Sequence, residues 1–182
     1  MQSQGARKMP VEQPLESLTS QQMIGHLRLT ALFVDIKDTP GALEALAQKM
    51  RIMSFQPNET IITEGEVKSE MYFLMDGHAA VYKSTLDGEQ YKVAIVDGKT
   101  HSFFGEGGLL ESDSRSATIK AESRCKCLVL SRADFEIFGR ANPQWAFPIL
   151  QRIARAVLLR LKKTNNDLML LYNALISEIR GH

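Results

Sequence analysis

The sequence lacks the long apolar run that a membrane-spanning helix requires. No segment approaches the roughly 18 consecutive apolar residues of such a span. The first residues, MQSQGARKMPVEQPLESL, also lack the apolar centre of a secretory signal peptide. We therefore expect a cytoplasmic protein with no membrane partner.

Charge of one sign, cysteine and histidine are equally scarce. The formal net charge of the 182 residues is +1, which argues against the basic surface of a nucleic-acid-binding protein. The two cysteines, Cys125 and Cys127, would point the same way on a strand, and small buried strand residues are the simplest interpretation. The four histidines are scattered, and we interpret each as a surface or turn residue. A metal site of the His-x-His type and a Ser-His-Asp hydrolase are both disfavoured, so we expect no metal and no enzymatic activity.

What is present is a β pattern between about residues 52 and 131. Short β-branched or aromatic segments alternate with Glu-Gly, Glu-Ser and three Asp-Gly pairs, which are tight-turn signals: Asp76-Gly77, Asp87-Gly88 and Asp97-Gly98. Six to eight short antiparallel strands at this spacing predict a sandwich or a jelly-roll β-barrel.

The regions on either side of the β pattern differ from it. Residues 1–20 are rich in Gln, Ser and Pro and predict a flexible N-terminal arm. The helical periodicity that follows predicts two short lead-in helices, the second started by Asp38-Thr39-Pro40. We thus expect a mainly β domain over residues 21–142 with flanking helices.

A long helix is expected over residues 143–182. Ser131 and Asp134 form a capping box for a short helix, and Asn142-Pro143 fits the start of the next. Pro148 predicts a kink or a restart. Apolar residues then recur at near-heptad spacing, at Ile153, Val157, Leu161, Leu168, Leu171 and Leu175, with polar Thr164 interrupting them. Because so long a helix outruns a small barrel, we expect a homodimer through this helix, and the alternative is a helix that packs only on its own barrel.

The stretch FGEGGLLESDSRSAT, residues 104–118, has the features of an anion site. Its glycines permit a tight turn followed by one helical turn over residues 106–110, and Arg115 supplies a planar fork for two phosphate oxygens. Glu106 fits beside an anion if its carboxylate accepts a hydrogen bond from a neutral hydroxyl, such as a ribose 2′-OH. A plain loop with a surface arginine, or an Arg115–Glu106 ion pair without a ligand, remain alternatives.

Residues 30–165 resemble the cyclic nucleotide-binding domain family, which includes the bacterial catabolite activator protein and the regulatory subunits of cyclic-AMP-dependent kinase. The segments LFVDI, FQPNETIITEGEVKSEMYFLMDGHAAVY, FGEGGLL, RSATIKA and LSRADFEIF occur in the family's order and spacing. This resemblance implies that Glu106 takes the ribose hydroxyl and Arg115 the cyclic phosphate, and that Arg160 stacks on the base. The other ligand-binding residues it implies are Val93, Gly105, Gly107, Gly108, Leu109, Ser116, Ala117 and Thr164.

The sequence departs from the family pattern at three points. Ser114 replaces the proline that commonly precedes the arginine, Gly107 replaces a large aliphatic residue, and Asn58 replaces a turn glycine whose left-handed conformation it can still adopt. Ser116 could bond either the phosphate or a guanine amino group. Our prediction of cAMP over cGMP or a cyclic dinucleotide is therefore a preference.

The output of such a sensor is not encoded in a recognisable second domain. The segment NALISEIRGH, which ends at His182, cannot house the DNA-binding domain of the catabolite activator class, so we expect no direct DNA binding and an unidentified effector protein. We expect a stand-alone module that signals through its terminal helix. The alternatives are a fragment of a larger regulated protein and a jelly-roll scaffold that has lost its ligand.

Overall fold

The computed structural model describes residues 19–111 and 114–180, so most of the predicted N-terminal arm lies outside the described residues. Its helices are α1 (Ser20–Leu29), α2 (Ala42–Ala47), α3 (Gly107–Leu110), α4 (Arg132–Ala141) and α5 (Pro143–Arg180), with the short 3₁₀ helices η1 (Ala31–Phe33) and η2 (Gly98–Thr100). Its strands are β1 (Met50–Phe55), β2 (Thr60–Ile62), β3 (Glu70–Asp76), β4 (His78–Ser84), β5 (Gln90–Asp97), β6 (Phe103–Phe104), β7 (Thr118–Ala121) and β8 (Cys125–Ser131).

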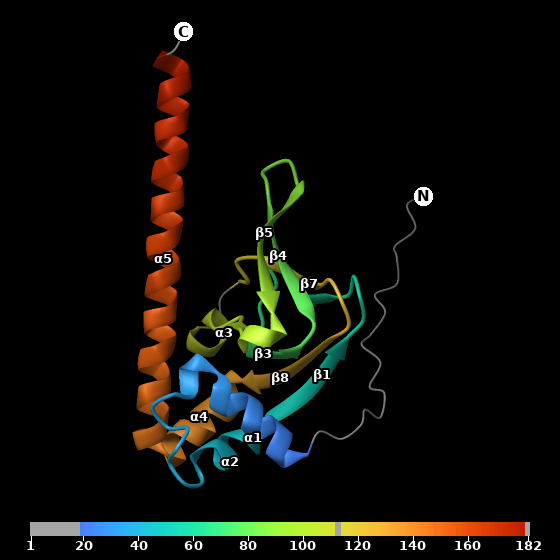
Figure 1. Cartoon of the computed structure of the whole chain (residues 1–182), viewed down its shortest axis with the longest axis vertical. Helices are drawn as coiled ribbons and strands as arrows, with labels where there is room; N and C mark the ends of the chain where they lie inside the picture. The colour runs from blue at the N-terminus through green and yellow to red at the C-terminus, as the bar shows by residue number, and fades with distance from the viewer. Residues whose placement is uncertain (1–18, 112–113, 181–182) are drawn as a thin grey trace.

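The strands form two antiparallel four-stranded sheets with the orders β1-β8-β3-β6 and β2-β7-β4-β5 (Figure 1). This confirms the mainly β class with flanking helices and a long terminal helix. The two sheets are not closed into a barrel, which corrects the predicted barrel to an open jelly-roll. Among the described residues, β1 and β5 are edge strands: β5 pairs only with β4, and β1 pairs only with β8.

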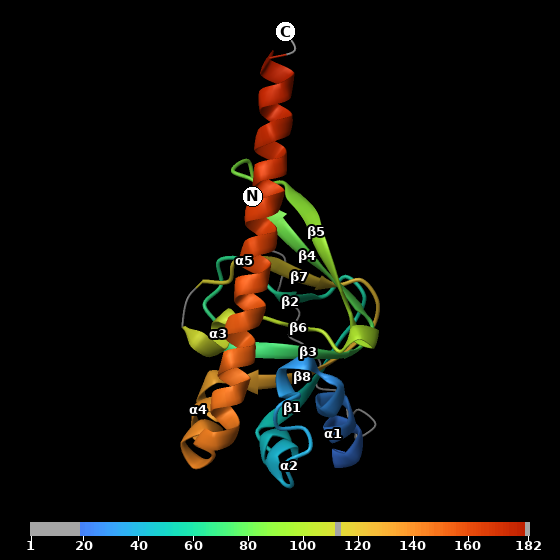
Figure 2. The same cartoon turned by 60° about the vertical axis from the view of Figure 1, so that its left-hand side comes forward.

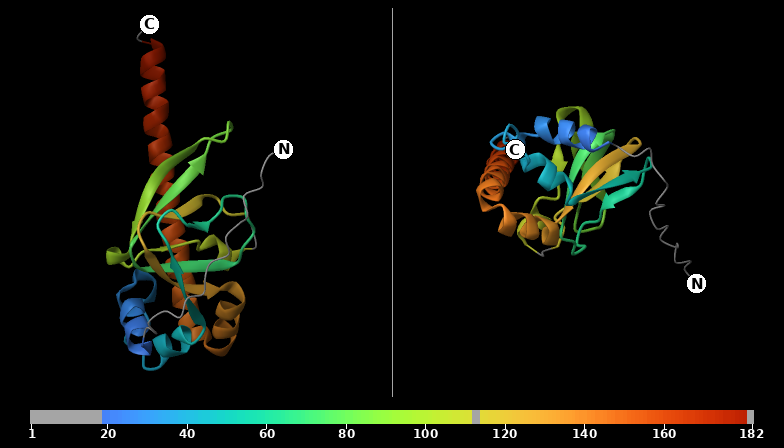
Figure 3. Two further views of the ribbon diagram at one scale, coloured as in Figure 1. Left: turned by 90° about the vertical axis from the view of Figure 1, so that its right-hand side faces the viewer. Right: turned by 90° about the horizontal axis from the view of Figure 1, so that it is seen from below.

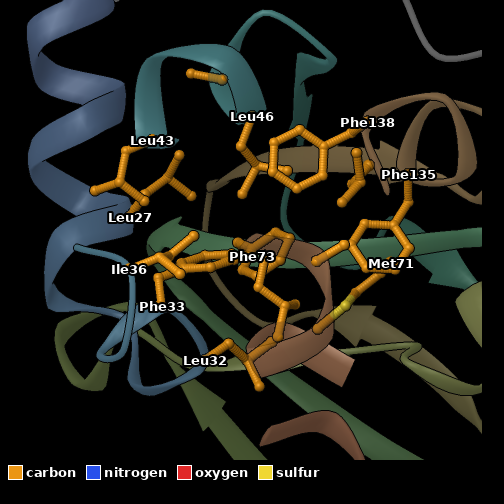
Figure 4. Packing of buried hydrophobic residues seen from close by; sticks show 14 of the residues in the cluster. Leu27, Leu32, Phe33, Ile36, Leu43, Leu46, Met71, Phe73, Phe135 and Phe138 are labelled. Atoms are coloured by element: carbon orange, nitrogen blue, oxygen red, sulfur yellow. The ribbon is translucent and has the colours of Figure 1, made fainter. Parts of the chain in front are cut away.

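The first sheet is buried on both faces, and its alternating residues contribute to two separate cores. On β3, Tyr72 and Leu74 point into the core between the sheets, while Met71 and Phe73 point into the core beneath the helices. The helix-side core is shown in Figure 4, where Phe73 lies near Phe33. Two-sided burial explains why these strands read as nearly continuous apolar runs. Cys125 and Cys127 are buried in the other core and are not disulfide-bonded, as predicted.

The signals that start the two lead-in helices, α1 and α2, differ from those predicted. Thr19 and Gln22 form a capping box that starts α1, a signal that the sequence analysis missed. The predicted start at Asp38 is wrong: α2 begins after Gly41, which has φ +81°, and the Asp38 carboxylate pairs instead with Arg28 at 2.8 Å. By contrast, Ser131 caps α4 by accepting from the Asp134 amide, as expected.

One of the three Asp-Gly pairs makes a hairpin turn, in which Gly88 joins the paired strands β4 and β5. Gly77 instead joins β3 of one sheet to β4 of the other, and both glycines have positive φ. The third pair starts η2, where the Asp97 carboxylate accepts from the Lys99 amide. Asn58 adopts the expected left-handed conformation with φ +69°. This position tolerates asparagine because its short polar side chain lowers the cost of that conformation.

Helix α5 runs from Pro143 to Arg180 without a break, so the restart expected at Pro148 is wrong. Pro148 is the sixth residue of this helix, so it removes the one hydrogen bond that an N–H at this position would donate to the Gln144 carbonyl. The first turns pack on the body through Ile149 and Ile153, and Arg152 forms a bidentate pair with Asp35 at 2.6 and 2.7 Å. Beyond these turns the helix rises past the sheets into open space (Figures 1 and 2). None of the described helices is long and apolar enough to cross a membrane.

Candidate ligand site

The predicted anion site lies where β6, α3 and the start of β7 meet one edge of the two sheets. Strand β6 leads into Gly105, α3 follows it, and Arg115 returns next to the loop after β2. In Figure 2 this region lies beside the rising α5. The side chains of Glu106 and Arg115 are both buried, at 8% and 7% exposed, so the structure brings two opposite charges into one enclosed place. Buried charges are rare unless they have a role or a partner.

Arg115 is oriented by two backbone carbonyls. Its Nη1 donates to the Gly105 oxygen at 2.9 Å and its Nη2 to the Glu70 oxygen at 2.6 Å. Its Nε is buried and has no hydrogen-bond partner among the described residues. One edge of the guanidinium therefore retains a donor for which the described protein provides no acceptor, and an anion's oxygen would supply one.

The glycines beside Arg115 are required by close packing. A Cβ on Gly108 would lie 2.6 Å from Arg115 Nη1 and 2.8 Å from the Lys68 carbonyl oxygen. Gly105 has φ +75°, which a side chain would strain. The Gly108 amide donates to the Gly105 oxygen at 3.1 Å, so this amide already serves the turn.

Glu106 is paired with the long helix. Its Oε1 forms an ion pair with Arg160 Nη1, and Arg160 Nη2 donates to the Phe103 carbonyl oxygen at 3.2 Å. The Arg160 guanidinium carbon also lies 5.4 Å from the centre of the Phe103 ring. Arg160 thus connects α5 with β6 and α3, and it pairs with Oε1 of Glu106 rather than Oε2.

The electrostatic setting keeps Arg115 charged. Burial lowers the pKa of Arg115, and the neighbouring acidic groups, Tyr72, Glu70, Glu66 and Glu106, raise it. A guanidinium stays protonated under these opposing effects. The site therefore has a fixed positive charge that does not depend on pH in the physiological range.

A second cation lies at the rim of the site. Lys83 on β4 contacts the Ser116 carbonyl oxygen, and its Nζ lies 3.7 Å from Glu64 Oε1. Because this lysine and this carboxylate are opposite in charge, they add little net charge at the rim.

The structure brings together some of the predicted residues and separates others. Gly105, Glu106, Gly108, Arg115 and Arg160 form one connected cluster. Gly107 and Ser116 are exposed and Ala117 is half-buried in the same loop region. Val93 is exposed on β5, and Thr164 is exposed on α5 one turn beyond Arg160. Leu109 is 5% exposed and packs in the helix-side core.

Three contributors were missed by the sequence analysis: Phe103, the Glu70 backbone and Lys83. Phe103 directly precedes the Phe-Gly-Glu turn, so its position was a usable signal. The Glu70 carbonyl carries no side-chain signal, since any residue would supply it. Glu70's own carboxylate is occupied elsewhere, by Arg51 and by the Tyr72 hydroxyl at 2.8 Å.

The residues present fit a cyclic phosphate on a ribose. The unpartnered Arg115 Nε suits a phosphate oxygen, and Glu106 Oε2 suits a hydroxyl donor. Fully ionised, Arg115, Arg160 and Glu106 carry two positive charges and one negative charge, a net excess of one positive charge. A cyclic phosphodiester carries one negative charge and would balance this excess. Within the described ranges 19–111 and 114–180, no group of three or more His, Cys, Asp or Glu residues could hold a metal ion.

A family model described as cyclic nucleotide-binding domain matches residues 52–142. The human potassium/sodium hyperpolarization-activated cyclic nucleotide-gated channel 1 is 33% identical over 136 residues, which are 71% of this chain and 14% of the channel. This chain thus spans only a small part of the length of that relative.

Two solved structures illustrate the likeness in fold. The N-terminal domain of a transcriptional regulator from Streptomyces coelicolor A3(2) has a TM-score of 0.65 and 26% identity, covering 79% of this chain and 94% of that one. The regulatory domain of Toxoplasma gondii PKA, crystallised with cAMP, has a TM-score of 0.64 and 18% identity, covering 76% of this chain and 49% of that one. At 18% identity the second likeness shows the fold alone.

Proposed function

This chain belongs to the cyclic nucleotide-binding domain family, and from that membership we propose that it is a non-enzymatic sensor of a cyclic mononucleotide. The observation that carries the proposal is the buried pair of opposite charges on one glycine-rich loop, Glu106 and Arg115, with the Arg115 Nε left without an acceptor in the described protein. Most buried side-chain polar atoms have a hydrogen-bond partner, so an unpartnered donor on a buried arginine is consistent with a ligand site.

In the proposed complex, each buried charge binds a different part of the ligand. Arg115 takes the cyclic phosphate, assisted by the amides of Gly107 and Ser116. Glu106 accepts the ribose 2′-hydroxyl on Oε2 while Arg160 occupies Oε1, since a carboxylate has lone pairs for both. The base then lies between exposed Val93 on β5 and the turn of α5 that carries Arg160 and Thr164.

We favour cAMP among the cyclic nucleotides. The net single positive charge of the cluster matches a cyclic mononucleotide better than a cyclic dinucleotide with two phosphates. Ser116 is compatible with cGMP, so parallel titrations with both ligands decide the preference.

The same proposal assigns a relay function to α5. Arg160 connects the site to this helix. Exposed apolar residues on both sides of Arg160 in the sequence form a seam suited to a second copy: Val157, Leu161, Leu168, Leu171 and Leu175. We propose a homodimer through this seam that passes ligand occupancy to an unidentified effector protein.

A second candidate function is a scaffold without a ligand. It is favoured by one observation: both Nη atoms of Arg115 and one oxygen of Glu106 are already paired within the protein. A scaffold of this kind would show no ligand-dependent change in melting temperature, whereas a sensor would.

The role of Glu106 predicts discrimination against a ligand that lacks the 2′-hydroxyl. A hydrogen bond to a charged group contributes about 1.5–3 kcal/mol, so the protein should bind cAMP roughly 10- to 150-fold more tightly than 2′-deoxy-cAMP. Glu106→Gln keeps an acceptor and should retain part of this ratio, while Glu106→Ala should bring it close to one. Isothermal titration calorimetry of both ligands measures the ratio.

Glu111→Gln is the matched control, because Glu111 is exposed at the end of α3. It should leave both affinities unchanged. A Glu106→Ala protein that still preferred cAMP by the wild-type factor would show that the carboxylate does not bind the ribose.

A further inference from the structure

Two histidines from distant parts of the chain meet beneath the sheets. His26 lies in the last turns of α1, and His101 follows η2. Their Nδ1 atoms are 3.3 Å apart, and their rings meet edge to face with centroids 4.7 Å apart. His26 is 8% exposed, which corrects its interpretation as a surface or turn residue.

The pair is enclosed by groups that offer little compensation for a positive charge. On α1, Arg28 is engaged with Asp38 at 2.8 Å. On the η2 segment, the Asp97 carboxylate accepts from the Lys99 amide and lies 3.6 Å from His78. On β3, the Leu74 backbone raises the pKa of His26, but burial and His101 lower it by more. No carboxylate pairs with His26 in the described chain.

The hydrogen-bond arrangement suits two neutral rings. Between facing Nδ1 atoms, one must carry the proton and the other must accept it. His26 Nε2 is buried and has no partner among the described residues, so a proton on this atom would be left without an acceptor. The favourable tautomer therefore has His26 donating from Nδ1 to His101.

Protonation destroys this arrangement. A proton added to His101 Nδ1 sets two N–H groups against each other. His26 can then accept only by moving its own proton to the buried Nε2. A proton added to His26 Nε2 places a charged ring in an apolar setting. Either event weakens the contact.

The backbone at His101 indicates that the contact is built into the fold. His101 has φ +49° and ψ +42°, a left-handed conformation that is uncommon outside glycine. Two residues later comes Phe103, which contacts Arg160 through its ring and its carbonyl. The histidine pair thus joins α1 to the segment that enters the ligand site.

We propose that His26 and His101 form a proton-sensitive contact that fixes α1 to the η2–β6 segment and loosens when the pair is protonated. This proposal does not depend on the identity of any ligand. Figure 3 shows α1 as a peripheral element of the helical layer, with the long α5 as a separate element. Its attachment can therefore change without unfolding the sheets.

Burial, followed by the charge of His101, lowers the pKa of His26 from 6.5 to about 4. Because the pKa of His26 is lowered in the attached state, the loosened state binds a proton more readily. Above pH 6.5 both the attached and the loosened states are neutral. As the pH falls from 6.5 toward 4, only the loosened state takes up the proton, so its population grows.

The test is hydrogen exchange of the α1 amides, expressed as protection factors so that the intrinsic pH dependence is removed. Between pH 7.5 and 5.5 the protection of α1 in the full chain should fall about tenfold relative to the sheet amides. His26→Leu fills the apolar site without a titrating group and should make α1 protection independent of pH. His101→Asn tolerates positive φ and should reduce the fall.

His78→Asn is the matched control, because His78 is an exposed histidine on β4 that pairs with Asp97, whereas His26 pairs with His101. It should retain the full tenfold fall. A His26→Leu protein with the same pH dependence as the wild type would overturn the proposal. An undiminished fall in His101→Asn would overturn the role of the pair.

Discussion

Arg115→Ala is expected to weaken cAMP binding by about 2–5 kcal/mol, which is roughly 30-fold to several thousand-fold in the dissociation constant. The ligand's phosphate would then enter an enclosed site that has lost its cation. The Arg115 side chain is 7% exposed, so water cannot readily replace the guanidinium. Titration calorimetry with cAMP measures the loss.

Arg115 also helps to order the loop, and this role must be separated from binding. Its two Nη donors connect Gly105 to Glu70, so the alanine variant should melt at a lower temperature even without ligand. Arg115→Lys keeps the charge but has no fork, and should lose less affinity than Arg115→Ala. Binding is therefore compared at a temperature at which circular dichroism shows each variant folded.

Arg124→Ala provides the control for a general change in charge. Arg124 is exposed in the turn between β7 and β8, away from the loop that carries Arg115. It should bind cAMP as the wild type does. Equal affinities of folded Arg115→Ala and Arg124→Ala proteins would contradict the assignment of Arg115 to the phosphate.

Truncation of the chain after Arg155 is expected to have two effects at once. It removes Arg160 and the exposed apolar seam, while keeping the buried contacts of Ile149 and Ile153 and the pair of Arg152 with Asp35. The truncated protein should be a monomer in sedimentation equilibrium. It should also bind cAMP more weakly, because Glu106 loses the partner that fixes its orientation.

Two point variants separate these effects. Arg160→Ala removes the contact with Glu106 and leaves the seam, whereas Leu168→Asp disrupts the exposed seam two turns beyond the site. Coupling between sites is reciprocal and typically about 1–3 kcal/mol. If site and seam are coupled, Leu168→Asp should give a monomer whose affinity for cAMP falls by about 5- to 150-fold.

A truncated protein that is still a dimer would show that α5 does not form the dimer. An unchanged affinity in both the truncated protein and Arg160→Ala would show that α5 does not cap the site. A monomeric Leu168→Asp protein with wild-type affinity would leave a dimer without a relay.

The elements that the sequence predicted well are those governed by local chemistry. Alternating apolar residues and Asp-Gly turns placed most of the strands, and Ser131 and Pro143 marked the starts of α4 and α5. The glycine turn before α3 could be predicted because residues with small or absent side chains are needed where the backbone packs against Arg115.

The features that were missed depend on contacts between distant segments. Asp38 looked like a helix cap, but its carboxylate binds Arg28, ten residues away. Arg160 pairs with Glu106, 54 residues away, and the sequence did not predict this contact. His26 looked like a surface residue because nothing in its neighbourhood in the sequence predicts His101 as a partner. Whether the two sheets close into a barrel depends on hydrogen bonds between their edge strands. The alternation of apolar residues along the sequence does not indicate these bonds.

Thermal melting of the wild-type protein with cAMP tests the central claim most directly. At 100-fold excess over its dissociation constant, a ligand that binds only the folded state stabilises it by about 2.7 kcal/mol. For a chain of this size the melting temperature should rise by about 5–10 °C. Noncyclic 5′-AMP, which carries a second negative charge, should give a much smaller rise. A melting temperature unchanged by millimolar cAMP or cGMP would contradict the proposed sensor and favour the scaffold.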